Sequence, residues 1–146
     1  MPFIKVYIHF VWSTKYRIPY LDTLELRQKV WQHIKENAVA KGIHVDYVNG
    51  HKEHCHCLVS MNSDQTIQQI MHLIKGESSY WINLERLTET RFEWQNDYFA
   101  VSVSESQVAR VRNYIKNQEN HHKNKSFEEE YEEWITKFGF EKFQDS

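Results

Sequence analysis

The sequence predicts an α+β fold: a ferredoxin-like (split βαβ) antiparallel sheet with helices on one face, followed by further C-terminal helices. Two observations predict this class. Segments rich in β-branched and aromatic residues alternate with helical segments in the order β-α-β-β-α-β-α-α. The second and third strands are separated only by the turn signal Asn49-Gly50, which indicates a hairpin. We expect a single domain over residues 1–146, with an acidic C-terminal helix and tail over 126–146.

The first half of the chain supplies three of the predicted strands. Residues 3–13 are nearly all apolar, which is typical of a strand covered on both faces. Asp22 is a predicted N-cap for a helix with an apolar i,i+4 stripe, and Gly42 ends it. Residues 43–48 alternate between polar and apolar side chains. After the turn, a strand over residues 54–61 completes the hairpin.

The second half supplies the last strand and the remaining helices. Asp64 is the predicted N-cap of a long amphipathic helix, and residues 98–104 alternate as a fourth strand. Ser104 then caps a helix that runs past residue 118. Ser126, with a glutamate three residues later, caps the last helix, which Gly139 ends.

Composition limits the functional classes. No apolar run approaches 18 residues, so no membrane helix is expected, and the first residues do not resemble a signal peptide. The two cysteines lie two apart on one strand, beyond good disulfide geometry, so we expect reduced thiols and a cytoplasmic protein. Residues 126–146 carry a net charge of −5 and the remainder +3, which permits an anionic polymer as partner.

The stretch His54-Cys55-His56-Cys57-Leu58 is the first candidate site. A strand alternates its faces, so we expect both imidazoles on an open face and both thiols in the core. Two imidazoles on a rigid strand can hold a divalent cation, whereas a zinc site that also uses the cysteines is excluded because they face the other way. With nine histidines, chance alone gives about 0.5 His-x-His pairs in a chain of this length, so two ordinary strand histidines remain an alternative.

Tyr114 and Gln118 form the second candidate site, because they lie one helical turn apart. Metal-assisted phosphoryl transfer can use a tyrosine nucleophile, with two imidazoles and a neutral amide oxygen holding the metal. Tyr114 as a residue at the core edge remains the alternative, since this spacing also arises by chance.

A wider pattern links the two sites. It comprises HFVWSTKYRIPYL (9–21), HCHCLVS (54–60), IKGESSYWIN (74–83), EWQNDYFAVSVSESQVARVRNYIKNQENHHK (93–123) and SFEEEYEE (126–133). In these stretches and their order, the chain resembles the small single-tyrosine transposases of bacterial insertion sequences (IS200-like), members of the HUH (His-hydrophobe-His) endonuclease superfamily. The resemblance implies that His54 and His56 bind metal, that Gln118 is the third ligand, and that Tyr114 is the nucleophile on the C-terminal helices.

The resemblance also implies partners and a reaction. The substrate would be single-stranded DNA with folded-back hairpins, and cleavage would leave a 5′-phosphotyrosine and a 3′-hydroxyl. The protein would be a homodimer whose active sites combine the histidine strand of one subunit with the tyrosine helix of the other. Mg²⁺ is the metal implied, and Mn²⁺ is expected to serve at least as well because imidazole suits it better. In two places the chain departs from the family: Cys55 stands between the histidines, and residues 96–100 lack the glycines common in relatives.

Other residues are weaker candidates. Candidate DNA-phosphate contacts are Lys15, Arg17, Lys75, Arg110, Arg112 and Lys116, although any single one is more often a solvated surface charge. Candidate base-stacking aromatics are Trp12, Tyr16 and Trp94, although such aromatics are more often part of the core. His121 and His122 are expected to interact favourably with the helix dipole at the end of the tyrosine helix. The acidic run over 128–133 is expected to be a solvated helix face. Two other functions remain open: a non-catalytic single-stranded nucleic-acid-binding module, and a domesticated relative acting on chromosomal repeat hairpins.

Overall fold

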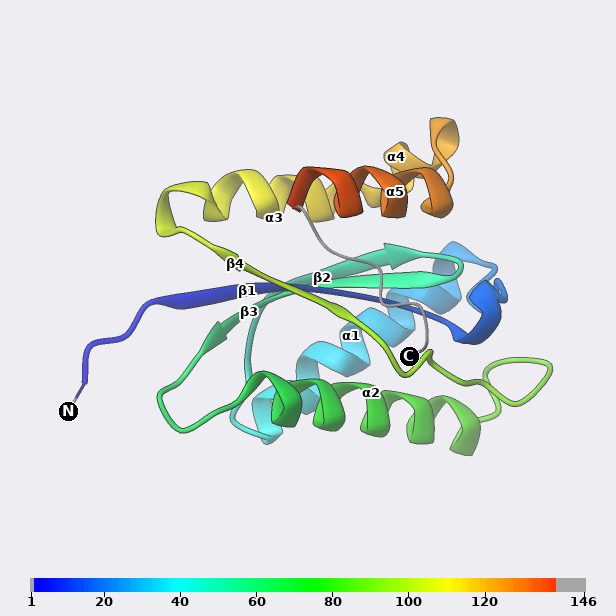
Figure 1. Ribbon diagram of the computed structural model, residues 1–146. Coiled ribbons are helices and arrows are strands. Elements are labelled where there is room, and N and C mark those ends of the chain that lie inside the picture. Colours follow the sequence, from blue (N-terminus) through cyan, green and yellow to red (C-terminus); the bar gives the residue numbers. More distant parts are fainter. Residues whose placement is uncertain (1, 139–146) are drawn as a thin grey trace.

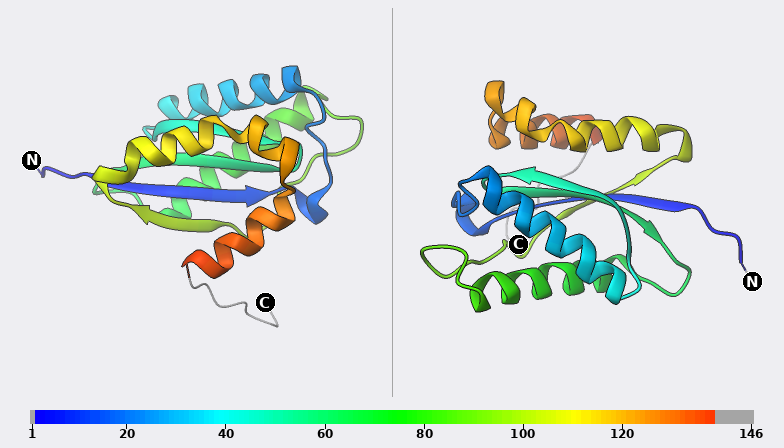
Figure 2. Two further views of the ribbon diagram at one scale, coloured as in Figure 1. Left: turned by 90° about the horizontal axis from the view of Figure 1, so that it is seen from above. Right: turned by 180° about the vertical axis from the view of Figure 1, so that it is seen from behind.

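The structure is a computed structural model that describes residues 2–138, and it is built around one four-stranded sheet with helices on both faces (Figures 1 and 2). The elements in chain order are β1 (Val6–Ser13), the 3-10 turn η1 (Lys15–Arg17), α1 (Leu24–Ala40), β2 (His44–His51), β3 (His54–Met61), α2 (Ile67–Leu84), β4 (Phe99–Val103), the 3-10 turn η2 (Glu105–Gln107), α3 (Val108–Lys116), α4 (Gln118–Asn124) and α5 (Phe127–Phe138). None of the helices within residues 2–138 has the length and apolar character that crossing a membrane requires.

The strand order is β2-β3-β1-β4, and every neighbouring pair is antiparallel. This order confirms the ferredoxin-like prediction. The two central strands, β1 and β3, pair with Ser13 opposite His54 and Val11 opposite His56. The histidine strand is therefore held on both edges, by β1 on one side and β2 on the other, which fixes its side chains firmly.

Helices α1 and α2 cover one face of the sheet and form the main core (Figure 1). Phe10 and Trp12 of β1 point into this core, together with Cys55 and Cys57 of β3. Both cysteines are free thiols with no solvent exposure, and burial raises their pKa above the ordinary range. The predicted placement of the thiols is confirmed. Trp12 and Trp94 are buried here as well, which confirms the core as the place of these two aromatics and rules out base stacking by them.

Helices α3, α4 and α5 cover the opposite face (Figure 2). Leu58 of β3 packs against Val108 and Ile115 of α3, while Phe127 and Trp134 of α5 pack over β1. The face that carries the two histidines was expected to be open. That expectation is wrong, because the apolar sides of these three helices are buried against the same face of the sheet.

The hairpin turn also lies later than predicted. Asn49 and Gly50 are part of β2, and the turn is formed by Lys52 and Glu53. Gly50 allows β2 and β3 to approach each other closely, since a Cβ at this position would lie 2.2 Å from the backbone oxygen of His54. Asn49 Nδ2 donates to the Ile115 and Lys116 carbonyls at the end of α3. These tertiary roles outweigh the local turn preference of the pair.

Helix ends differ from prediction by one or two residues. Thr23 Oγ1 accepts from Leu26 N and caps α1 in place of Asp22, and Thr66 with Gln69 forms a capping box for α2 in place of Asp64. The predicted Ser126 cap is confirmed, because Ser126 Oγ accepts from Glu129 N at 3.1 Å. Gly139, the predicted end of the last helix, lies outside the described residues.

Candidate active site

His54 is fully buried, and its two ring nitrogens have different partners. Nδ1 lies 2.7 Å from the Glu53 carboxylate, which can only accept, so Nδ1 carries a proton. Nε2 lies 2.9 Å from Gln118 Oε1, which is also an acceptor.

His56 is also fully buried and is held by the neighbouring strand. Its Nδ1 lies 3.0 Å from Nε2 of His9 on β1, and its Nε2 lies 3.2 Å from Glu130 Oε1 on α5. Burial lowers the His56 pKa to about 4 despite the opposing effect of Glu130. His56 is therefore neutral at pH 7, the form in which imidazole binds metal.

Tyr114 and Gln118 reach this cluster from two helices. The helix that the sequence predicts to be continuous is interrupted at Asn117, so Tyr114 lies in α3 and Gln118 begins α4. The half-buried Tyr114 ring lies 5.7 Å from the His56 ring between centroids. The structure thus brings all four predicted site residues together within one chain.

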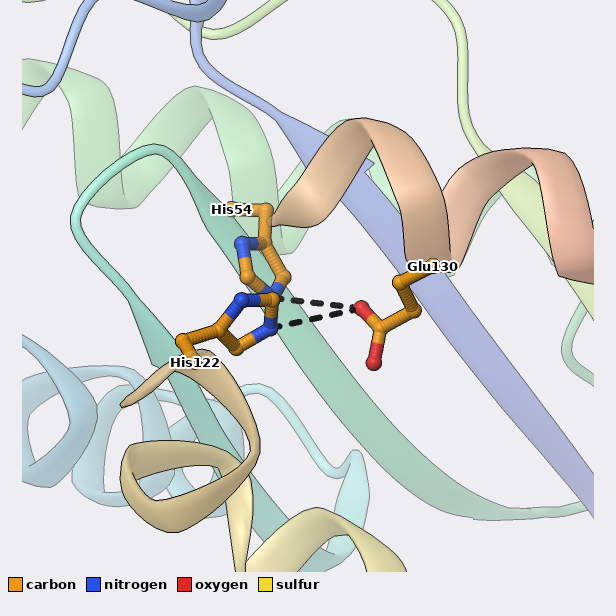
Figure 3. Close-up of side chains that lie close together, drawn as sticks. All are labelled: His54, His122 and Glu130. Carbon is orange, nitrogen blue, oxygen red and sulfur yellow. Dashed lines mark ion pairs between the residues drawn. The ribbon is translucent and has the colours of Figure 1, made fainter. Parts of the chain in front are cut away.

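Glu130 and His122 also belong to this cluster, and neither was predicted to (Figure 3). Only 2% of Glu130 is exposed, so the expectation of a solvated helix face is wrong at this position. The sequence does indicate that Glu130 faces inward, because its spacing from Phe127 and Trp134 places all three residues on the buried side of α5. His122 Nε2 lies 3.1 Å from Gln118 Oε1 and 3.6 Å from Glu130 Oε1.

The Glu130 carboxylate connects the predicted metal ligands to the predicted nucleophile. Oε1 faces the histidines, at 3.5 Å from His54 Nε2, while Oε2 accepts hydrogen bonds from the Tyr114 hydroxyl and Gln118 Nε2. Burial alone would raise the pKa of Glu130, but hydrogen bonds from His122 and His56 hold it well below its usual range. Burial and the negative charge of Glu130 raise the pKa of Tyr114 above its ordinary value.

The ligand atoms of His54, His122 and Glu130 all lie within 4.8 Å of one another, close enough together to hold one divalent ion, whereas His56 is not part of this group. Neighbouring ligand atoms around bonds of about 2.1 Å lie about 3.0 Å apart in an octahedron and about 3.4 Å apart in a tetrahedron. The separations of His54 Nε2 from Gln118 Oε1 and of His56 Nε2 from Glu130 Oε1 are 2.9 and 3.2 Å. Imidazole nitrogens and amide and carboxylate oxygens are all ligands of Mg²⁺ or Mn²⁺, so the residues present suit such an ion.

The cations predicted to contact DNA differ in whether they already have partners within the chain. Four of the six cations already have partners: Lys15 pairs with Glu93, Arg112 with Asp46, Lys75 with the carbonyls of residues 95–97, and Arg17 lies over the rings of Phe127 and Tyr131. Arg110 and Lys116 are exposed on α3, without an ion pair to another residue in 2–138. Tyr16 is 81% exposed. DNA contact by these residues remains a prediction.

A ferredoxin-like sheet with paired strand histidines, and with a tyrosine and a glutamine on the covering helices, defines the HUH class of proteins. Comparison with known proteins gives the family: the profile for "Transposase IS200 like" matches residues 3–118. The chain therefore belongs to the IS200-like transposase family. The matched segment contains His54, His56, Tyr114 and Gln118, whereas α5 lies beyond it.

Individual relatives agree with this assignment. The ISDra2 transposase TnpA of Deinococcus radiodurans is 26% identical over 115 residues, covering 75% of this chain and 81% of that protein. Two solved structures share the fold. A candidate transposase from D. radiodurans R1 superimposes with a TM-score of 0.65 at 22% identity, covering 80% of this chain and 93% of that one. A REP-associated tyrosine transposase bound to a REP hairpin gives 0.61 at 17% identity, covering 84% and 72%.

Proposed function

We propose that the protein cuts and rejoins single-stranded DNA at insertion-sequence ends through a 5′-phosphotyrosine, assisted by a divalent metal. One observation carries the proposal: the Tyr114 hydroxyl and the ring nitrogens of His54 and His56 meet at a single carboxylate within one chain. A nucleophile and metal ligands in such proximity are what phosphoryl transfer requires. Membership of the transposase family supports DNA as the substrate.

Tyr114 would act as the nucleophile. Its phenolic oxygen attacks the scissile phosphorus, the bond from phosphorus to the 3′ oxygen breaks, and the 5′ phosphate stays on the tyrosine. The proton lost by Tyr114 is balanced by the proton gained on the released 3′-hydroxyl. Because the phenolate is a good leaving group, attack by another 3′-hydroxyl reverses the step and joins strands.

His54, His56 and Gln118 would hold the metal. When bound, the ion polarises the phosphate and stabilises the charge that develops on it. The two Nε2 atoms are suited to this because their Nδ1 atoms are engaged by Glu53 and His9. Mg²⁺ is our first choice, and Mn²⁺ should support cleavage at least as well because imidazole suits it better.

The DNA strand would approach from the α4 side. An open hollow of about 390 Å³ is lined by Asn117, Asn120, His121, Asn124 and Lys125. The His121 ring contacts the Tyr114 ring, with 4.7 Å between centroids, so this hollow borders the nucleophile. Arg110 and Lys116 on the exposed side of α3 would add phosphate contacts. The REP hairpin bound by the structural neighbour supports a hairpin as the recognised form of DNA.

The subunit arrangement is a separate part of the proposal. A homodimer with shared sites would pair the histidine strand of one subunit with the tyrosine helix of the other. Here α3 contacts β2 and β3 of its own chain, through Asn49 and Leu58 among others. A shared site therefore requires these helices to exchange between subunits while keeping the same contacts.

A second candidate keeps this chemistry and changes the substrate: hairpins at chromosomal repeats. The completeness of the site within one chain favours it, because a processing enzyme needs to cut only one hairpin at a time. The DNA that flanks the gene distinguishes the two functions. A transposase requires cleavable hairpins at both ends of its own element, whereas a domesticated relative requires dispersed repeats.

The experiment that tests the proposal is a cleavage assay on hairpin-bearing single strands from the gene's flanks, with Mg²⁺ or Mn²⁺. A denaturing protein gel detects a DNA-linked band. We expect the band with the wild type, and its loss with chelator and in Tyr114→Phe while DNA binding is retained. Tyr80→Phe, an exposed tyrosine on α2, is the matched control and should keep the band. DNA binding with no linked band on any strand would support a non-catalytic binding module instead.

A mixing experiment tests the shared site. Tyr114→Phe and His56→Asn should each be inactive alone. If sites are shared, mixing the two restores cleavage, because one composite site contains both intact residues. If each chain uses its own tyrosine, the mixture stays inactive.

A further inference from the structure

We infer that Glu130 is a further catalytic residue: its Oε1 is a ligand of the divalent metal and its Oε2 positions the hydroxyl of Tyr114. The inference rests on the proposed function and extends it to α5, a helix beyond the segment that the family profile matches.

The first observation is the position of Oε1 among the imidazoles. It lies 3.2 Å from His56 Nε2, 3.5 Å from His54 Nε2 and 3.6 Å from His122 Nε2. Neighbouring ligands in a coordination shell lie about 3.0–3.4 Å apart for bonds of about 2.1 Å, so the His56 separation falls within this range and the other two lie slightly above it. Figure 3 shows the imidazoles of His54 and His122 and this carboxylate directed toward one another from β3, α4 and α5.

The second observation is the charge balance. Glu130 is a buried carboxylate, and the partners that the structure gives it are His54, His56, His122, Gln118 and Tyr114. None of these groups carries a permanent positive charge. Buried anions are normally paired with a cation or coordinate a metal, so a divalent ion would supply the charge that this environment lacks.

The third observation is the chemistry of the remaining ligands. Two imidazoles and an amide form a neutral set that is softer than Mg²⁺ and Mn²⁺ prefer. A carboxylate is the hard, anionic ligand that such ions usually take. Glu130 therefore makes this site suitable for the metals that the proposed function requires.

The fourth observation is the bond to the nucleophile. Glu130 Oε2 accepts the Tyr114 hydrogen bond while Oε1 faces the histidines, so one rigid group sets the position of the phenol relative to the ion. Helix α5 keeps this group in place: its Phe127 ring stacks on His54 at 4.2 Å between centroids, and the Arg17 guanidinium lies over the same ring at 5.3 Å from its centroid.

The test measures metal binding directly, apart from activity. Mn²⁺ affinity is determined by calorimetry and by the electron paramagnetic resonance signal of free Mn²⁺, for the wild type, Glu130→Gln and Glu130→Asp. Glu128→Gln, an exposed glutamate on the same helix, removes the same charge outside the site and is the matched control. Circular dichroism confirms that each variant is folded.

We expect Glu130→Gln to weaken Mn²⁺ binding at least tenfold and Glu130→Asp to fall between it and the wild type. Ni²⁺ affinity should fall less than Mn²⁺ affinity, because Ni²⁺ depends more on the imidazoles. Unchanged Mn²⁺ affinity in folded Glu130→Gln would overturn the inference. Tighter binding with faster cleavage would also overturn it, because the carboxylate would then be competing with the ion. A wild type that binds no Mn²⁺ would instead contradict the metal site of the proposed function.

Discussion

Nε2 of His9 lies 3.0 Å from Nδ1 of His56, joining two buried imidazoles on the adjacent central strands. If His56 Nε2 held the proposed metal, the ring proton would have to lie on Nδ1, and His9 Nε2 is placed to accept it. The Trp134 ring packs edge-on against His9 at 4.8 Å between centroids, so the acceptor cannot turn away easily. His9 would thus set the orientation and the protonation state of His56, a proposed metal ligand, without touching the metal itself.

The first prediction concerns this pair. His9→Leu removes the acceptor and should weaken Mn²⁺ binding about 10- to 100-fold, the usual effect of losing such a partner. His9→Gln can still accept through its amide oxygen and should recover most of the affinity. Calorimetry on both variants makes the measurement. His33→Leu, which loses a histidine–glutamate bond far from the site, should bind Mn²⁺ like the wild type. Equal affinity of His9→Leu and His9→Gln would contradict the positioning role.

The sequence was sufficient to predict the sheet and the pair of histidines on one face of it. Strand periodicity and the β-α-β-β-α-β order depend on local patterns, and these determine the fold class. The hairpin turn was misplaced because Gly50 serves a close contact between strands and Asn49 serves the end of α3. An Asn-Gly pair looks the same in the sequence whether it forms a turn or makes tertiary contacts of this kind.

The site was predicted only in part, for a similar reason. Glu130 lies in a run of glutamates that reads as a solvated face, and His122 follows another histidine at a helix end. Only the packing of α4 and α5 against the sheet selects which of these side chains face inward. The i,i+3,i+7 spacing of Phe127, Glu130 and Trp134 is the one sequence signal that pointed to it.

The second prediction concerns how α4 is held. The buried guanidinium of Arg27 donates to both carboxylate oxygens of Glu119, at 2.8 and 3.0 Å, and to the Leu21 carbonyl. Lysine cannot make this forked contact, so Arg27→Lys should lower the free energy of unfolding by about 1–2 kcal/mol. Because α4 carries Gln118, Mn²⁺ affinity should fall as well.

Arg112→Lys is the control for Arg27. Arg112 makes the same forked contact with Asp46, but 45% of its side chain is exposed. Solvent screens that pair, so its substitution should change the unfolding free energy less than Arg27→Lys does. Urea denaturation measures both, and equal effects of the two substitutions would contradict a special role for Arg27.

The third prediction concerns Gly50. Alanine at this position places a Cβ against the His54 backbone oxygen, and main chain cannot move aside as a flexible side chain can. Gly50→Ala should therefore cost about 1–3 kcal/mol of stability and shift the start of β3, weakening metal binding. Gly76→Ala, where the Cβ meets nothing within 4 Å in the middle of α2, should instead stabilise the protein by about 0.5–1 kcal/mol. Chemical denaturation of both variants tests the contrast.

The fourth prediction concerns acid stability of the metal-free protein. Burial lowers the pKa of His56 to about 4 and holds the pKa of His9 well below its ordinary value. Between about pH 4 and 6.5 the unfolded chain therefore binds more protons at these residues than the folded one, and stability falls as the pH falls. For His56 alone the loss is about 3 kcal/mol over that range. The pKa of Glu130 is also depressed, and its contribution is lost in the same direction on further acidification.

His122 acts with the opposite sign. Burial lowers its pKa, but the hydrogen bond to Glu130 and the negative charges of Glu130 and Glu53 together outweigh burial and raise the pKa. The contribution of His122 to stability is therefore present below about pH 6.5 and is lost as the pH rises through the folded value. Melting temperatures of the chelated protein from pH 4 to 8 should thus fall steeply below pH 6.5. In His56→Gln the slope over that range should be shallower, whereas His44→Gln, at an exposed position on β2, should keep the wild-type slope. Identical slopes for His56→Gln and wild type would mean that His56 gains its proton without cost, and so is not shielded from water beneath α5.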